Sequence, residues 1–205
     1  MTINRPDGRL IDVIGFTHRT RDSERTKETI LIAAERLIAE KGVHALTLDE
    51  VAARGSVSKG GLLHHFASKR ALIDGLAARM IALYDADIDE RRKQDPAAPG
   101  AYTRALMRAG LASLDECSRI CAALSAECRD FPEMLARFQA HSAHCDRMLA
   151  ADGLDPLVAS TVRYATDGLM LAARWGMPKP ANYEALVQHL LELAGGKKTN
   201  ETETE

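Results

Sequence analysis

Apolar residues recur at helical spacing along most of the chain, and short polar or glycine-containing segments separate them. The first clear apolar stripe begins at Ile30 and predicts an amphipathic helix over about 24–41. Ser23 stands where an N-cap is expected, and Gly42 stands where a helix ends in a left-handed residue. Residues 1–22 show no such stripe, so we expect them to form a flexible arm.

Three further helices are predicted before the proline-rich segment "QDPAAPG" at 94–100. In "TLDE", Thr47 and Glu50 have the spacing of a capping box, and the short helix that they begin ends near Arg54 at a Gly-Ser turn. The next two helices are capped by Ser58 and Ser68 and end near Phe66 and Lys93.

Beyond this break the same periodicity continues, and short segments with proline or glycine interrupt it. The helices are predicted at roughly 101–113, 115–129, 132–151, 156–175 and 182–194. No stretch indicates a convincing strand, and the composition is rich in alanine and leucine and poor in aromatic residues. We therefore predict an all-α protein.

The elements group into two helical domains. A three-helix domain with a helix-turn-helix occupies 23–68, a connecting helix follows at 69–93, and a larger helical domain occupies 94–195. The flexible arm at 1–22 and a polar, disordered tail at 196–205 flank them.

Charge is distributed unevenly between the two halves of the chain. Residues 1–80 carry 13 Lys and Arg against 10 Asp and Glu, although the whole chain has a formal net charge of −2. A basic front half is expected where only that half meets a polyanion. The four cysteines fall in helix-like segments, which favours reduced thiols and a cytoplasmic location, and no apolar run is long enough to span a membrane.

Glycines and basic side chains interrupt the apolar pattern of the short helix that Ser58 begins, and a role in DNA binding accounts for them. A helix-turn-helix presents its second helix to the major groove of DNA, so one side must be polar and approachable. Lys59 and His64 can point outward, and Gly60 lets the backbone come close to DNA. The residues expected to face inward are Val57, Leu62 and Phe66.

The run "TLDEVAARGSVSKGGLLHHFASKRAL" at 47–72 is similar to the N-terminal DNA-binding domain of the TetR/AcrR family of one-component transcriptional regulators. The positions that match the family pattern are Thr47, Val51, Ala52, Val57, Ser58, Gly60, Leu62, His65, Phe66, Ser68, Lys69 and Leu72. The length of the chain and its number of predicted helices also suit that family.

Two positions depart from the family pattern. The family has a small residue and then glycine in the turn, where this chain has Gly55 and then Ser56. Either the left-handed residue moves by one position, or Ser56 accepts a strain of about 1 kcal/mol. Leu63 stands where the family usually has a tyrosine whose hydroxyl reaches DNA, so an apolar contact or the neighbouring His64 and His65 replace that contact.

The resemblance implies a set of DNA-binding residues. Thr47 and Lys69 are implied to bind phosphates, helped by the amides at the starts of their helices, and Lys59, Gly60 and His64 are implied to read bases. The full predicted set is Thr47, Ser58, Lys59, Gly60, Leu63, His64, His65 and Lys69. The partner implied is double-stranded DNA with an inverted-repeat operator, and no cofactor is implied.

The resemblance further implies a C-terminal domain that encloses a small-molecule pocket and pairs with a second copy of the chain. Two apolar stripes suit a homodimer interface: Val158, Val162, Ala165, Leu169 and Ala172, and Tyr183, Leu186, Val187, Leu190 and Leu191. An alternative is that these stripes are core within one chain.

The pocket is predicted from the larger apolar residues and a few charges of the C-terminal domain. The candidates are Arg104, Met107, Cys121, Phe131, Met134, Phe138, Tyr164, Asp167, Met170, Arg174 and Trp175. The implied function is a ligand-responsive regulator, most simply a repressor that an unknown small-molecule effector releases from its operator.

Two alternatives stay open. Cys117, Cys121, His141 and Cys145 form two i,i+4 pairs that suit a metal- or redox-sensing regulator. A helical adaptor that binds only protein is a second alternative. An enzyme is not expected, because the sequence contains no E-x-x-H pair, phosphate-binding glycine loop or G-x-S-x-G elbow.

Overall fold

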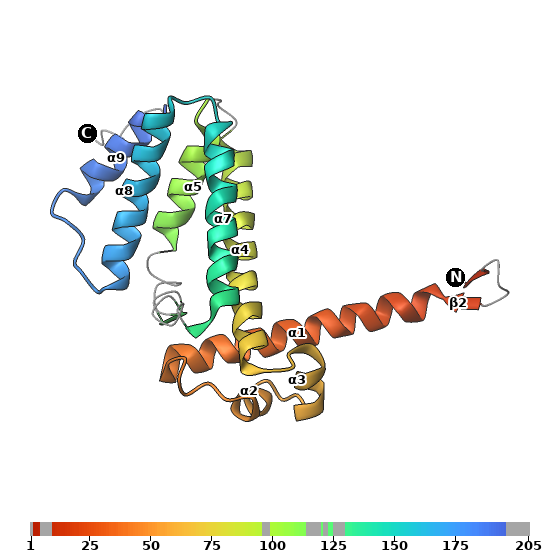
Figure 1. The fold of residues 1–205 in the computed structure, drawn as a ribbon. Helices are drawn as coiled ribbons and strands as arrows, with labels where there is room; N and C mark the ends of the chain where they lie inside the picture. The colour runs from red at the N-terminus through yellow and green to blue at the C-terminus, as the bar shows by residue number, and fades with distance from the viewer. Residues whose placement is uncertain are drawn as a thin grey trace, which may run out of the picture. The chain divides into compact units, whose positions relative to one another are not determined.

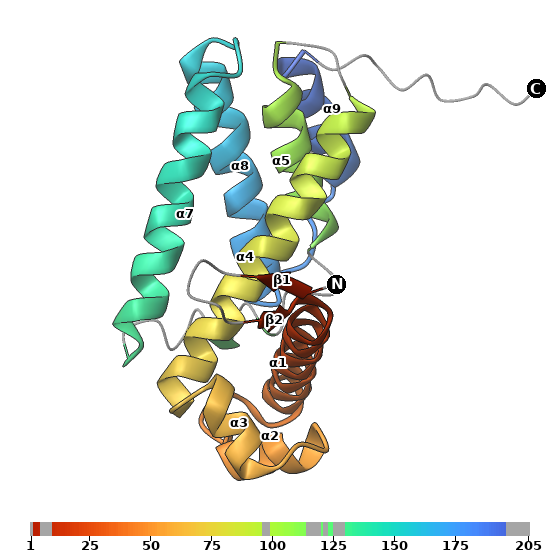
Figure 2. The ribbon, with the colours of Figure 1, turned by 90° about the vertical axis from the view of Figure 1, so that its right-hand side faces the viewer.

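The computed structural model describes residues 2–4, 10–95, 99–113, 120, 123–124 and 130–195, with side chains described from residue 21 onward. The chain forms two compact units, Met1–Leu76 and Ala77–Glu205. The boundary falls inside α4 (Lys69–Gln94), a helix that is continuous in sequence through both units. Figures 1 and 2 together label the elements of each unit.

The first unit begins with two short strands that were not predicted. β1 (Thr2–Asn4) and β2 (Leu10–Asp12) pair antiparallel, with Ile3 opposite Ile11. All other regular elements in the described part of the chain are helices. The prediction of an all-α protein is confirmed.

The first helix, α1 (Val13–Lys41), is longer than predicted. Ser23 does not cap it, so the predicted start near residue 24 is wrong. The backbone stays helical through this region, where the Thr26 hydroxyl donates to the Asp22 carbonyl oxygen at 2.8 Å and Arg25 pairs with the Asp22 carboxylate at 3.4 Å. The predicted end is confirmed, because Gly42 adopts a left-handed φ of 80° directly after Lys41.

The core of the first unit lies between α1, α2 (Leu48–Arg54) and α3 (Lys59–His65). The α2 and α3 helices lie on the same side of α1 in Figures 1 and 2. The predicted apolar stripe of α1 is buried in this core, together with apolar residues of the other elements: Ile30, Ala34, Leu37, Ile38, Val51, Leu62, Phe66, Leu72 and Ile73.

In its described residues, the second unit contains the rest of α4 and four further helices. These are α5 (Ala101–Ala112), α7 (Pro132–Ala150), α8 (Pro156–Arg174) and α9 (Tyr183–Leu193). Each end agrees with the predicted end within one residue. The α5, α7 and α8 helices pack against one another, and α9 packs on α8 (Figure 1). The predicted helix at 115–129 falls on residues of which only 120, 123 and 124 are described.

Side chains distant in sequence set the start of α5. Both Asp152 carboxylate oxygens accept from this helix: Oδ1 from the Tyr102 amide at 2.9 Å and Oδ2 from the Thr103 amide at 2.8 Å. Because the first amides of a helix have no partner within the helix, a carboxylate there both satisfies them and complements the helix dipole. The α7–α8 turn therefore fixes the position of α5.

Candidate nucleic-acid interface and effector cavity

The helix-turn-helix begins at a cap that the sequence predicts correctly. The Thr47 hydroxyl accepts a hydrogen bond from the Glu50 amide at 3.2 Å, and α2 starts at the next residue, Leu48. The Glu50 carboxylate accepts from Lys41 Nζ at 2.8 Å. This hydrogen bond and the lysine charge lower the pKa of Glu50, so the carboxylate stays ionised and ties the end of α1 to the start of α2.

The turn between α2 and α3 resolves the two alternatives left by the sequence. Gly55 has a φ of −78°, and Ser56 takes the left-handed conformation with a φ of 52°. A Cβ on Gly55 would lie 3.2 Å from the Val51 carbonyl oxygen and 3.6 Å from Ala33 Cβ. Gly55 thus provides close packing against α1, and Ser56 carries the strain.

Ser56→Gly is expected to raise the free energy of unfolding by about 0.5–1 kcal/mol, because relief of left-handed strain exceeds the entropy that glycine adds to the unfolded chain. Ser58→Gly is the matched control, since Ser58 has a φ of −69° and caps α3. It should lower the stability by a few tenths of a kcal/mol. Urea unfolding followed by circular dichroism compares the two, and equal shifts in midpoint would contradict a strained Ser56.

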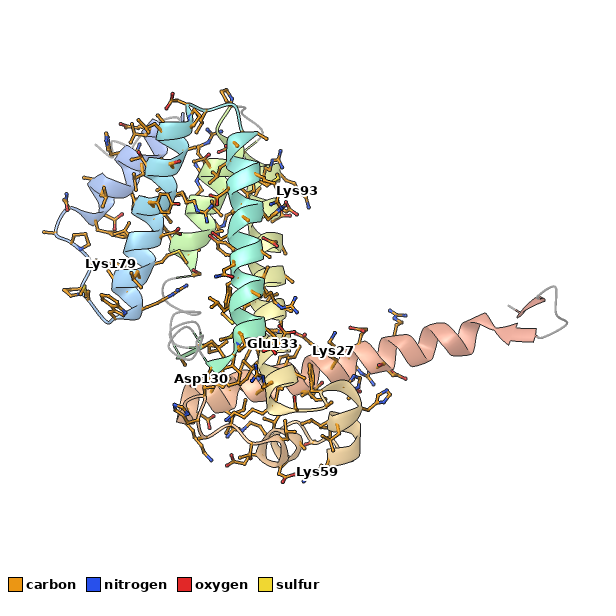
Figure 3. The ribbon with its side chains drawn as sticks, viewed as in Figure 1. Lys27, Lys59, Lys93, Asp130, Glu133 and Lys179 are labelled. Carbon is orange, nitrogen blue, oxygen red and sulfur yellow. The ribbon has the colours of Figure 1, made fainter. Side chains whose placement is uncertain are left out.

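One face of α3 is buried and the other is open. The Ser58 hydroxyl caps the helix by accepting from the Gly61 amide at 3.0 Å. Leu62 and Phe66 are buried as predicted, whereas Leu63 is 40% exposed. The remaining open positions are Lys59, Gly60 and His64. Figure 3 shows Lys59 at the edge of the first unit opposite α1. The α3 helix therefore offers a mixed polar and apolar face with room for a ligand to approach.

The basic side chains next to this face have weak partners in the free protein. Lys59 Nζ lies 2.8 Å from Asp49 Oδ1, and both side chains are largely exposed. Lys69 Nζ donates to the His44 carbonyl oxygen at 3.2 Å. An exposed ion pair contributes at most about 1 kcal/mol, so a phosphate or a base edge can compete for Lys59 at low cost.

The two histidines of α3 differ in their surroundings. Their rings lie 5.4 Å apart in an edge-on arrangement. His64 is exposed and His65 is half-buried. Burial, and then the neighbouring His64, lower the pKa of His65. Neutral His65 has one donor and one acceptor nitrogen, and His64 is the more accessible of the two.

The second unit contains a cavity of about 190 Å³. Its described lining residues are Met80, Ile81, Tyr84, Leu106, Ser113, Phe138, His141, Ser142, Cys145, Arg163, Asp167, Met170 and Arg174. Of the residues predicted for the effector pocket, Phe138, Asp167, Met170 and Arg174 line it. The sequence predicts α4 only as a connection between the domains, so its part in lining the cavity was not predicted. The helical spacing of Ile81 and Tyr84 was the available signal.

Most of the other predicted pocket residues lie elsewhere. Met107 and Met134 are buried outside the described lining, and Met107 packs with Val162 of α8 and Leu190 of α9. Tyr164 on α8 is 66% exposed, and Trp175, the C-cap residue of α8, is 70% exposed. Phe131 stands at the N-cap position of α7 and is not in the described lining, and Cys121 lies outside the described residues.

Arg104 has a structural partner instead of a place in the cavity. Its Nε lies 2.6 Å from Asp95 Oδ2, and its Nη1 donates to the Ala194 carbonyl oxygen at 2.5 Å and to the Pro99 carbonyl oxygen at 3.1 Å. The side chain is only 1% exposed. The guanidinium therefore ties both the segment before α5 and the end of α9 to α5.

The polar wall of the cavity is dominated by Arg163. This side chain donates to the Ser142 carbonyl oxygen and hydroxyl on α7, pairs with Asp146, and lies 3.6 Å from Asp167 Oδ2. Burial raises the pKa of Asp167, and Arg163 opposes that rise. Arg174 also lines the cavity, so α8 contributes three charged side chains to a largely apolar space.

The predicted metal- or redox-sensing cluster is only partly within the described residues. Cys117 and Cys121 lie outside them, whereas His141 and Cys145 line the cavity. Among the described residues no group of three or more His, Cys, Asp or Glu side chains is arranged to hold a metal ion.

The predicted dimer stripes lie partly in the core of the same chain. Val162 and Leu190 are buried with Met107, and Ala165, Leu186, Val187 and Leu191 pack against them. A different set of side chains, on α8 and at its C-cap, is exposed at 46–78%: Leu157, Tyr164, Leu171 and Trp175. A partner that contacts α8 would meet this second set, because Val162 and Ala165 of the first set already pack with residues of α5 and α9.

These features define the class of protein: a helix-turn-helix DNA-binding protein with a second helical unit that contains a cavity. Residues 30–76 match the family described as "Bacterial regulatory proteins, tetR family", and residues 100–195 match the "Tetracyclin repressor-like, C-terminal domain". The chain belongs to the TetR family of transcriptional regulators. Members of this family are DNA-binding regulators and not enzymes, and small-molecule effectors are typical of it.

Individual relatives agree with this assignment. The chain is 30% identical over 71 residues to the TetC protein of transposon Tn10 from Escherichia coli, covering 35% of this chain and 36% of that protein. It is 34% identical over 58 residues to the HTH-type transcriptional repressor BepR of Brucella suis, covering 28% of each chain. These matches therefore span about a third of the relatives' lengths.

The fold is also shared with solved structures. A transcriptional regulator from Rhodococcus sp. Rha1 superposes with a TM-score of 0.66 at 25% identity, covering 82% of this chain and 94% of that one. Within the part of the chain that is described, no helix has the length and apolar character needed to cross a membrane.

Proposed function

We propose that this protein is a repressor that binds an inverted-repeat operator as a homodimer and is released when a small molecule occupies the cavity of its second unit. The exposed face of α3 is the observation that carries the proposal. Leu62 and Phe66 anchor this helix in the core, while Lys59, Gly60 and His64 stay open to a groove.

The exposed side of α8 supports the homodimer. Leu157, Tyr164, Leu171 and Trp175 recur at intervals of seven and four residues, which places them along one face of the helix. Large exposed apolar side chains that gather on one face indicate an interaction surface. A second copy of α8 is the simplest occupant, since a single α3 reads few base pairs and an inverted repeat needs two copies.

The cavity supports control by a small molecule. Its volume of about 190 Å³ exceeds the roughly 150 Å³ of an apolar cavity known to hold benzene, so it can take a molecule of about one ring. Met80, Ile81 and Tyr84 of α4 line it, and Lys69 begins the same helix. Because α4 thus supplies both an operator contact and a cavity wall, we propose it as the element through which the ligand acts.

Gly60→Ala is expected to separate DNA binding from stability. A Cβ at this position would meet no atom within 4 Å in the free protein, so the unfolding free energy should stay equal or rise by up to about 0.5 kcal/mol. Operator affinity should fall at least about tenfold, because the added methyl group prevents close approach to DNA.

Gly61→Ala is the matched control, since a Cβ there meets only the Ser58 hydroxyl, at 3.1 Å, within the protein. Gly61 is half-buried, so its variant should bind DNA nearly as the wild type does. Fluorescence anisotropy with a duplex selected from random DNA measures both variants. Equal affinities for Gly60→Ala and wild type would contradict the role of α3.

Selection from random DNA, with light scattering at micromolar concentration, tests the proposal as a whole. An inverted repeat with half-sites one helical turn apart, roughly 34–36 Å, and a dimer in solution are the expected results. A monomer that selects no sequence would refute the proposal and favour an adaptor that binds only protein.

A further inference from the structure

A cluster of nucleophilic and titratable side chains lines the cavity and takes no part in DNA binding. Cys145 Sγ lies 3.7 Å from His141 Nε2 and 4.0 Å from His141 Nδ1. His141 Nε2 in turn lies 2.8 Å from Asp85 Oδ1 on α4. Cys145 is a free cysteine, and both it and His141 line the cavity. The thiol therefore stands at the wall of a space that can admit a small molecule.

Charged and hydroxyl groups from every neighbouring helix surround this thiol. Tyr84 on α4, Tyr102 on α5, His141 on α7 and Arg163 on α8 act on it directly. Asp85 on α4 bonds His141, and Asp167 on α8 lies 3.6 Å from Arg163. Burial alone would raise the pKa of Cys145, but hydrogen bonds from His141 and Tyr102 and the positive charges of His141 and Arg163 outweigh it and lower that pKa. The sulfur is thus held toward its nucleophilic thiolate form.

The histidine is held in its charged form at neutral pH. The hydrogen bond with Cys145 raises the pKa of His141, burial opposes this, and the hydrogen bond with Asp85 adds to the rise, giving a value of about 9. Protonated histidine donates from both ring nitrogens. His141 therefore provides a proton beside the sulfur, and this is the pairing that activates cysteine nucleophiles.

We propose that Cys145 is a covalent capture site for small α,β-unsaturated carbonyl compounds that enter the effector cavity. The inference rests on the proposed function, because it names the ligand class of the same cavity. The volume limits the compound to about one ring, and Ile81, Leu106, Phe138 and Met170 supply apolar walls for its carbon skeleton.

The addition needs no further reactant. The thiolate lone pair attacks the β-carbon and forms a C–S bond, the electrons of the C=C bond move onto the carbonyl as an enolate, and His141 gives its proton to the α-carbon. The product is a thioether with a saturated carbonyl, neutral His141 and no leaving group. A thioether does not stabilise protonated His141, so the ion pair between His141 on α7 and Asp85 on α4 weakens. The modification of Cys145 therefore changes a contact of α4, the helix that begins at Lys69.

N-ethylmaleimide is the test probe, because it is a one-ring α,β-unsaturated carbonyl. Peptide mass spectrometry of the folded full-length protein measures the rate of modification at Cys145 separately from the other cysteines, from pH 5 to 9. We expect Cys145 to react at pH 7, and N-(1-pyrenyl)maleimide, which exceeds the cavity volume, to react at least about tenfold more slowly at this position.

Variants of residues near Cys145 test whether the thiol is activated by His141 and Asp85 or reacts only because it is accessible. His141→Gln should lower the rate at pH 7 about tenfold and move the pH profile toward that of an ordinary thiol, which is only a few per cent ionised there. Asp85→Asn changes a side chain that is 41% exposed, and it should lower the rate of modification at Cys145 severalfold. It serves as the test if His141→Gln does not fold. His144→Gln, on the exposed side of α7, should leave the rate unchanged.

The results separate this inference from the proposed function. Modification of Cys145 only after unfolding, or an unchanged pH profile in both His141→Gln and Asp85→Asn, would overturn it. Operator binding by the same unlabelled protein would then still support the proposed function. Labelling of Cys145 without a change in affinity for the selected operator would support covalent capture and contradict control of DNA binding from the cavity.

Discussion

Lys59→Ala is expected to abolish most sequence-specific binding while leaving the fold intact. Removing a base-reading side chain costs about 1–3 kcal/mol of binding free energy in each subunit, so a dimer is weakened by roughly 2–6 kcal/mol, which lowers the affinity about 30-fold or more. The side chain is 63% exposed, and its ion pair with Asp49 is a surface pair, so the unfolding free energy should change by less than about 1 kcal/mol.

Two further lysine variants distinguish reading from charge. Lys69→Ala should weaken binding about equally on all sequences and lower the slope of log affinity against log salt by ~1 per half-site, because this lysine is proposed to contact a phosphate. Lys93→Ala removes the same charge from an exposed position at the other end of α4 and should change neither property.

Anisotropy titrations of the three variants on the selected operator and on a scrambled duplex, at several salt concentrations, measure these effects. Lys59→Ala should lower affinity mainly on the operator and so reduce the ratio between the two duplexes. A uniform decrease on both duplexes would assign Lys59 to the phosphate backbone and leave His64 and Leu63 as the readers.

Arg104→Ala should destabilise the second unit by about 3–5 kcal/mol, because it removes a buried charged donor that bonds a carboxylate and two carbonyl oxygens, although Asp95 keeps its pair with Arg108. The variant removes the bonds to Asp95 and leaves the carbonyl oxygens of Pro99 and Ala194 without this donor. The segment before α5 and the end of α9 are then both detached from this side chain.

Arg108→Ala is the matched control, because its guanidinium lies 2.9 Å from the same Asp95 carboxylate while the side chain is 38% exposed. It should cost less than about 1 kcal/mol. Equal decreases in stability of the two variants in urea unfolding would contradict the special weight given to Arg104.

The Arg104 effect should depend on pH in a defined direction. The hydrogen bond from Arg104 is the largest cause that lowers the pKa of Asp95; burial opposes it, and Arg108 adds to the lowering. The ionised carboxylate therefore stabilises the fold fully above the unfolded pKa of about 3.9, and this contribution declines as pH falls through the lower folded value. The difference between wild type and Arg104→Ala should shrink below about pH 4.

Local signals in the sequence predicted the helices well where one residue alone decides the backbone. Thr47, Ser58 and Gly42 set helix ends through their own side chain or their own φ, so their effect needs no distant partner. Ser23 has the same capping chemistry, but it lies inside α1, because the preceding residues also fit a helix. A cap is thus informative only when the chain before it leaves the helical conformation.

The candidate DNA-binding face could be predicted from the sequence. The α3 helix has only seven residues, and once Leu62 is assigned to the core, helical periodicity predicts which of the others are exposed. The cavity could not be predicted in this way. Its described lining comes from four helices. The apolar periodicity of a helix predicts that a residue faces inward, but it does not predict which other helix that residue contacts. Met107 and Met170 both lie at inward-facing positions, yet only Met170 lines the cavity.

The sequence by itself determined most of the helices, the caps at Thr47 and Ser58 and the family, since these depend on interactions within a few residues and on a contiguous motif. Only the tertiary structure decided the long-range pairings. Arg104 meets the Ala194 carbonyl ninety positions away, and Asp85 meets His141 across α4 and α7. A charged side chain carries no local signal of its distant partner, and which face of α8 is core depends on where α5 and α9 pack.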